Sequence, residues 1–134
     1  MLPFSIDLKL GLPVTEQIIF AVKKAVVGGQ LRAGDPFPSV RVLSQELKIN
    51  PNTAHKVIAL LVSEGVLLTK PAIGSVVAEP ASGSQRDRAA LLQTEVERLV
   101  VEARKLGLSQ EELRAALAAH WEKFNRAERQ HPHK

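Results

Sequence analysis

Two short helix-start signals, Pro38-Ser39-Val40-Arg41 and Asn50-Pro51-Asn52-Thr53, constrain the fold of this 134-residue chain more than any other feature. Ser39 and Asn50 can each cap the first turn of a helix through a side-chain oxygen. Pro51 suits a first helical position because its missing N–H needs no partner there. The two signals are separated by the length of one short helix. The sequence therefore predicts two consecutive short helices joined by a tight turn.

The helix that starts at Pro51 and runs to about Glu64 has two chemically different faces. At roughly 100° per residue, one face collects the apolar side chains of Ala54, Val57, Ile58 and Leu61. The opposite face collects small, polar or basic side chains, namely Asn52, Lys56, Ala59 and Ser63, with Thr53 and His55 at its edges. A helix that packs on one side and presents such residues on the other is typical of a recognition helix in a DNA major groove.

Before these two helices, the sequence predicts an extended arm over residues 1–12. It then predicts a helix that begins at Pro13 and ends at Gly28-Gly29. Apolar residues recur along that helix, at Val14, Ile18, Val22, Ala25 and Val26. A turn-rich connector follows over 31–38, and the Ser39-capped helix then has Val40, Leu43 and Leu47 as its inward residues.

The chain after the recognition helix predicts a β-hairpin. Two short β-prone runs, 66–69 and 75–78, flank the five residues from Lys70 to Gly74. Three helices followed by a hairpin make a winged helix-turn-helix, which we expect to span residues 1–79. The predicted fold is mainly α with a small β-hairpin.

The composition changes to small and helix-breaking residues over 79–84, so we expect a linker at 80–85 and a separate element from 86 to 134. A long amphipathic helix is predicted over about 86–106, with its apolar stripe at Leu92, Val96, Leu99, Ala103 and Leu106. Ser109 and Glu112 fit a capping box that starts a last helix. Its stripe is Leu113, Leu117, Trp121 and Phe124, and we expect the tail 130–134 to fray.

Composition and charge narrow the classes of function. The net charge is +4 and the sequence pI about 9.7, a balance that suits a nucleic-acid partner. Residues 1–78 hold eight Lys or Arg against five Asp or Glu, so the positive excess lies mainly on the predicted winged domain. The absence of Cys excludes disulfides, thiolate chemistry and Cys-based zinc sites.

Further classes lack sequence support. The first residues lack the basic and apolar regions of a signal peptide, and no apolar run approaches the roughly 18 residues that span a bilayer, so we expect a cytoplasmic protein without membrane contact. No nucleophile–base pair, carboxylate pair or phosphate-binding glycine loop is recognisable, so we expect neither an enzyme nor a cofactor. His131 and His133 flank a proline without a carboxylate partner, and we expect no metal site. His120 stands beside Trp121 in the last helix, which favours a packing role.

Several motifs follow one another in a specific order: Gly29-Gln30-Leu31, Gly34, Pro38-Ser39-Val40-Arg41, Leu43, Leu47, Asn50-Pro51-Asn52-Thr53 and Glu64-Gly65-Val66-Leu67. This run resembles the GntR family of bacterial transcription regulators. The Asn-Pro-Asn-Thr motif, the opening Phe4-Ser5-Ile6-Asp7 and the short helical C-terminal part resemble the YtrA-type subfamily. The resemblance covers residues 4–78, and it departs from the family pattern at Ala72, which stands in place of a common wing glycine.

The resemblance implies a DNA-binding site and its residues. Ser39 and Arg41 are expected near DNA at the start of the second helix, Asn52, Thr53 and His55 on the recognition helix, and Gly74 at the wing tip. Lys56 stands where the subfamily usually has Arg. By their charge, Arg32 and Lys70 are further candidates for phosphate contacts.

The resemblance also implies that the two C-terminal helices form a homodimer interface, because two helices with one apolar stripe each bury that stripe poorly alone. The expected interface residues are Leu92, Val96, Leu99, Ala103, Leu117, Trp121 and Phe124. A two-fold dimer would present two recognition helices to a palindromic operator. The expected function is a transcriptional regulator, most simply a repressor, and the subfamily resemblance suggests transporter genes as targets. A small-molecule effector cannot be named.

Two alternatives remain at this point. A winged helix can serve protein–protein interaction without DNA affinity, although that class usually lacks a polar and basic outward face such as Asn52, Thr53 and Lys56 supply. The apolar residues of the C-terminal helices can instead line a ligand pocket, but two helices cannot enclose a cavity of the usual size while forming their own core.

Overall fold

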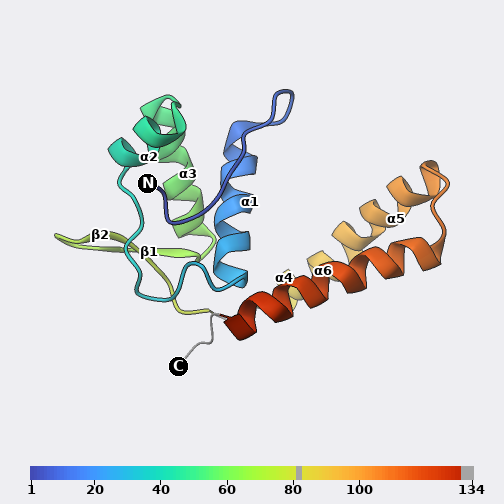
Figure 1. The fold of residues 1–134 in the computed structure, drawn as a ribbon. Coiled ribbons are helices and arrows are strands. Elements are labelled where there is room, and N and C mark those ends of the chain that lie inside the picture. The colour runs from blue at the N-terminus through green and yellow to red at the C-terminus, as the bar shows by residue number, and fades with distance from the viewer. Residues whose placement is uncertain (81–82, 131–134) are drawn as a thin grey trace. The chain divides into compact units, whose positions relative to one another are not determined.

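The computed structural model describes residues 1–80 and 83–130, and the chain divides into two compact units (Figure 1). The first unit comprises Met1–Pro80 together with the last turn of the final helix from Ala127, and the second unit ends at Arg126. Residues 81 and 82 of the predicted linker, and the tail from 131 with its two histidines, lie outside the described residues.

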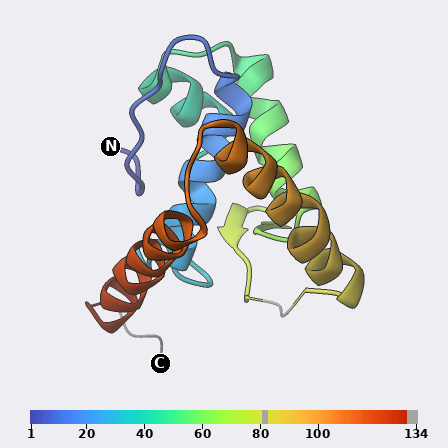
Figure 2. The same ribbon diagram turned by 90° about the vertical axis from the view of Figure 1, so that its right-hand side faces the viewer.

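The first unit is a winged helix-turn-helix, as predicted. Its elements are α1 (Val14–Val27), α2 (Val40–Leu47), α3 (Pro51–Ser63), β1 (Leu67–Lys70) and β2 (Gly74–Val77). Helices α1 and α3 lie side by side in both views, and α2 packs on α3 (Figures 1 and 2). β1 and β2 form an antiparallel hairpin in which Leu67 pairs with Val77 and Lys70 with Gly74.

One apolar core holds these elements together. Ile18 and Val22 of α1, Leu43 of α2, and Val57 and Leu61 of α3 are fully buried. The N-terminal arm joins this core through Phe4, whose ring stacks on Phe37 with 5.9 Å between the ring centroids. Val14, the first of the apolar residues that recur along α1, is 36% exposed, whereas Ile18, Val22 and Ala25 are buried.

The connector between α1 and α2 pairs with the hairpin, which the turn-rich sequence did not predict. The Phe37 N–H donates to the Ser75 carbonyl at 2.9 Å, and the Val77 N–H donates to the Asp35 carbonyl at 2.9 Å. Pro36 and Val76 form a β-bridge between these bonds. The connector therefore acts as a third short strand, and it couples the hairpin to the start of α2.

Both predicted helix caps are confirmed. The Ser39 side chain accepts a hydrogen bond from the Val42 N–H at 3.2 Å, and the Asn50 side chain accepts one from the Asn52 N–H at 2.7 Å. Between α2 and α3 the chain turns at Lys48, whose φ of 55° is left-handed. These local bonds fix where α2 and α3 begin.

The second unit consists of α4 (Gln85–Ala90), a π-helical turn (Leu91–Glu95), α5 (Val96–Lys105) and α6 (Gln110–Gln130). The predicted long helix over about 86–106 is confirmed, since α4, the π turn and α5 follow one another without a break from Gln85 to Lys105, and the π turn is its one departure from α-helical geometry. Leu91 and Leu92, at the start of this turn, are both exposed. The predicted capping box is confirmed, since Glu112 N–H donates to Ser109 Oγ and Ser109 N–H donates to Glu112 Oε2.

The second unit leaves most of its apolar side chains exposed. Among its described residues only Ala103 is buried, and Leu113 and Phe124 are half-buried. The exposed large apolar residues are Leu91, Leu92, Val96, Leu99, Val100, Val101, Leu106, Leu108, Leu117 and Trp121. Helices of this length gain most of their stability from packing of an apolar face, so this unit has an unpartnered face.

Candidate nucleic-acid interface

The outward face of α3 is built as its sequence predicts. Ala54, Val57 and Leu61 are fully buried against the core, so the side chains on the other face are turned to solvent. Asn52, His55 and Lys56 are exposed, and Thr53 is half-buried at the edge. The exposed residues supply amide, imidazole and ammonium groups, which are the kinds of group that contact base edges and phosphates.

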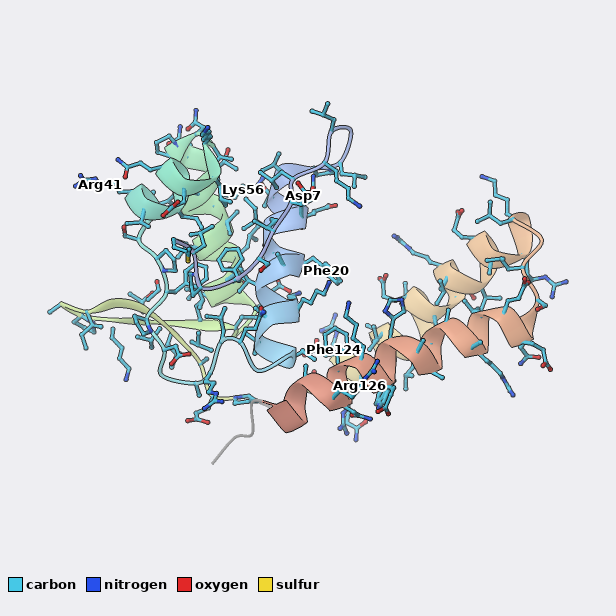
Figure 3. All side chains as sticks on the ribbon, viewed as in Figure 1. Asp7, Phe20, Arg41, Lys56, Phe124 and Arg126 are labelled. Carbon is cyan, nitrogen blue, oxygen red and sulfur yellow. The ribbon has the colours of Figure 1, made fainter. Side chains whose placement is uncertain are left out.

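The start of α2 contributes a cap and a free cation. The oxygen of Ser39 accepts the Val42 N–H, which leaves its hydroxyl proton available to donate. Arg41 lies in the first turn of α2, and its side chain extends to the same side of the unit as the hairpin tip (Figure 3). Within the described residues its guanidinium makes no hydrogen bond or ion pair.

In α2, α3 and the hairpin, the acidic residues form ion pairs, whereas the basic residues form none within the described part of the chain. Glu46 accepts the Met1 amino group at 2.5 Å, and Glu64 accepts Lys23 Nζ at 2.5 Å. These two glutamates are the only acidic residues in 39–78. The basic residues of the same segment, Arg41, Lys48, Lys56 and Lys70, are exposed and form no ion pair in the described part of the chain. The surface that carries α3 therefore presents a positive excess.

Two of the residues predicted to contact DNA, Lys70 and Gly74, lie at the tip of the hairpin. Lys70 ends β1, is exposed, and lies across the ladder from Gly74, whose φ of 101° is left-handed and favours glycine. Ala72 has a φ of 67°, so an alanine occupies a backbone conformation that usually calls for glycine. The sequence did not single out Ile73, which follows Ala72 and is exposed.

Arg32 lies in the connector, directly after the turn that follows α1. Its backbone N–H donates to Asp35 Oδ2 at 2.8 Å, and its side chain is exposed. It borders an open hollow of about 510 Å³ between the N-terminal arm and the connector, whose other lining residues are Leu2, Pro3, Phe4, Ser5, Gly29, Gln30 and Asp35. Its exposure and charge keep Arg32 a candidate for a phosphate contact.

Comparison with known proteins identifies this architecture. The family model described as "Bacterial regulatory proteins, gntR family" matches residues 14–77. The HTH-type transcriptional repressor YtrA of Bacillus subtilis is 30% identical over 109 residues, which cover 81% of this chain and 84% of that protein. This chain belongs to the GntR family. It accordingly carries the DNA-binding helix-turn-helix of these transcriptional regulators.

Two solved structures from Listeria monocytogenes resemble this GntR protein along most of its length. One, titled as a transcriptional antiterminator, is 27% identical with a TM-score of 0.79 and covers 90% of this chain and 91% of its own. The other, titled as a GntR family transcriptional regulator, is 25% identical with a TM-score of 0.63 and covers 84% and 98%. The likeness therefore includes the helices beyond the winged unit.

The residues predicted for a dimer interface all lie in the second unit. Leu92, Val96, Leu99, Leu117 and Trp121 are exposed, Phe124 is half-buried, and Ala103 is buried. The prediction did not include Leu91, Val100 and Val101, which are also exposed. No described helix is long and apolar enough to cross a membrane. The described residues also contain no cluster of three or more His, Asp or Glu that could hold a metal ion.

Proposed function

We propose that this GntR protein is a cytoplasmic transcriptional repressor that binds a palindromic DNA operator as a homodimer. The observation that carries the proposal is the exposed polar and basic face of α3 together with the guanidinium of Arg41, which has no partner among the described residues. Both elements belong to the first unit, and the two acidic residues of 39–78, Glu46 and Glu64, are already ion-paired. Such a surface attracts phosphates and brings α3 to the groove edge.

The proposed contacts divide into two kinds. Asn52, Thr53, His55 and Lys56 are assigned to the major groove, where amide and cationic groups distinguish base pairs. Arg32, Ser39, Arg41, Lys70 and Gly74 are assigned to phosphates or to the groove edge. Phosphate contacts hold the unit in register without reading sequence, and they make affinity fall as salt rises.

The homodimer is proposed from the second unit. Its exposed stripe includes Leu92, Leu117 and Trp121, and full burial of one such side chain stabilises by about 1.5–3 kcal/mol. A second copy of the chain offers the same stripe, so a two-fold arrangement covers both at once. The two recognition helices then face two half-sites, which accounts for a palindromic operator.

The repressor assignment draws on the named activity of the Bacillus subtilis relative, which is a repressor. Transporter genes are proposed as targets on the subfamily resemblance alone. A repressor of this kind needs an operator that overlaps a promoter, so the operator sequence is the quantity to determine first.

The test is selection of bound sequences from a random pool of double-stranded DNA by the full-length protein. We expect a palindrome with fixed half-site spacing, and affinity for it that falls steeply with salt. Enrichment of a single, unrepeated site would contradict the dimeric operator. Absence of binding at low salt would contradict the DNA-binding proposal and favour a protein-interaction role for the winged unit.

A further inference from the structure

The tip of the hairpin holds one large apolar side chain outside the core. Ile73 is 69% exposed, whereas Leu67, Val76 and Val77 of the same hairpin are buried. The Ile73 N–H donates to the Lys70 carbonyl at 3.2 Å, which closes a turn over these four residues. Exposure of an isoleucine at this point is not required to form either strand, so its side chain is free to contact something else.

The backbone holds Ile73 in a fixed position. Pro71 and Ala72 form the centre of the turn, and the positive φ of Ala72 after a proline fits a type II turn. A type II turn normally has glycine where Ala72 stands, so the conformation persists because the hairpin enforces it. Ile73 is thus presented by a tip with little freedom.

The hairpin is also tied to the start of α2. The bond from Phe37 N–H to the Ser75 carbonyl and the bridge from Pro36 to Val76 join the connector to β2. The connector leads directly into the Ser39 cap, two residues before Arg41. The tip and Arg41 lie on the same side of the unit (Figure 3), so DNA that contacts Arg41 is accessible to the tip.

Charge at the hairpin favours approach to DNA. Residues 66–78 contain no acidic residue and one basic residue, Lys70, which pairs with Gly74 beside the tip. Lys70 thus supplies a cation for a phosphate beside the exposed Ile73. An isoleucine cannot form hydrogen bonds to base edges. Apolar side chains in the minor groove instead wedge against or between base steps and bend the duplex.

We propose that Ile73 is an apolar wedge that enters the minor groove next to the α3 contact. It makes affinity depend on how easily the contacted base steps deform. Flexible pyrimidine–purine steps need less free energy to deform than stiff A-tracts do. Ile73 therefore selects sequence without reading hydrogen-bond patterns. This inference rests on the proposed DNA-binding function and adds a specificity residue to it.

The test compares Ile73→Ala with a matched control, Leu68→Ala, in the full chain. Leu68 is the other exposed aliphatic side chain of the hairpin, at 49%, but it lies on β1 away from the tip. The probe is the duplex selected by the wild-type protein, with a dye at each end to report bending by energy transfer. Two further probes replace the base steps outside the α3 half-sites with a TA step or with an A-tract.

We expect Ile73→Ala to bind the TA duplex about tenfold more weakly, to bend it less, and to lose the preference for TA over the A-tract. Leu68→Ala should retain all three properties. Ile73→Lys should tighten binding to every duplex through its charge without restoring the preference. Equal behaviour of Ile73→Ala and wild type, or equal losses in both alanine variants, would overturn the wedge. If the wild-type protein binds none of the duplexes, the proposed function itself fails.

Discussion

The two units of this chain treat their apolar side chains in opposite ways. The winged unit places Ile18, Leu43 and Leu61 in a common core with no exposure, and it leaves polar and basic groups on the surface of α3. The helical unit leaves Trp121 70% exposed and buries only Ala103 among its described residues. The winged unit thus buries its own apolar face, whereas the helical unit leaves its apolar face exposed, which is the basis of the proposed dimer.

The largest expected effect comes from the core of the winged unit. Leu61→Ala should lower the free energy of unfolding of this unit by about 2–5 kcal/mol, because it opens a cavity at a fully buried site. Leu117→Ala, on the exposed face of α6, is the matched control. Thermal unfolding over a range of protein concentrations measures both. Equal destabilisation by Leu117→Ala at every concentration would mean that the helical unit buries its own stripe.

Trp121→Ala tests the exposed apolar face of the helical unit. A large aromatic at the centre of an interface commonly contributes about 2–4 kcal/mol, so we expect self-association to weaken at least about thirtyfold. The control is Phe20→Ala, which removes an aromatic that is 66% exposed on α1 of the winged unit. Sedimentation equilibrium measures both variants. If Phe20→Ala weakens association more than Trp121→Ala, the interface lies on the winged unit.

Arg41→Ala should affect DNA binding alone. We expect operator binding to weaken by about 1–3 kcal/mol. The slope of log affinity against log salt concentration should become shallower by about one, as for the loss of one phosphate contact. Arg98→Ala, an exposed arginine on α5, is the control that should leave binding unchanged. Titrations of labelled operator at several salt concentrations measure both. An unaltered affinity for Arg41→Ala would remove this residue from the proposed contacts.

Ser39→Ala removes the side-chain cap of α2 and should destabilise the winged unit by about 1 kcal/mol. Ser84 caps α4 in the same manner, with the Asp87 N–H donating to its Oγ at 3.0 Å. Chemical denaturation of Ser84→Ala should leave the transition of the winged unit in place. A shift of that transition in Ser84→Ala would show that the two units unfold as one.

Ala72→Gly gives the smallest expected effect. Glycine relieves the left-handed strain but makes the unfolded chain more flexible, so we expect a net gain of roughly 0.5 kcal/mol. Gly74→Ala is the reverse change at a φ of 101° and should destabilise the hairpin. Hydrogen exchange of the hairpin amides measures both. A loss of stability in Ala72→Gly would contradict a strained turn at the tip.

Local signals in the sequence predicted the winged unit well. Ser39, Asn50 and the Ser109–Glu112 pair act on neighbouring N–H groups, so their caps can be read from a few residues. The helical spacing of the apolar residues also predicted which face of α3 is buried. The residues assigned to DNA and dimer contacts remain predictions, because no partner of this chain is present in the structure.

Features that depend on distant parts of the chain were not predictable in this way. The pairing of Asp35 and Phe37 with β2 joins residues far apart in sequence, and the connector alone reads only as a turn. The π turn at Leu91–Glu95 is hidden because both Leu91 and Leu92 are apolar, so the stripe continues in either register. The exposed Ile73 gave no pattern, since one apolar residue in a turn has no periodicity.

Sedimentation equilibrium of the full chain, alone and with the duplex selected from a random pool, tests the central claim most directly. The account predicts a reversible dimer in the free protein and two chains on each duplex. Trp121→Ala should lower both the fraction of dimer and the number of chains on each duplex. A monomer at all concentrations together with one chain on each duplex would contradict it, because the exposed stripe of the helical unit would then have no second copy to cover it.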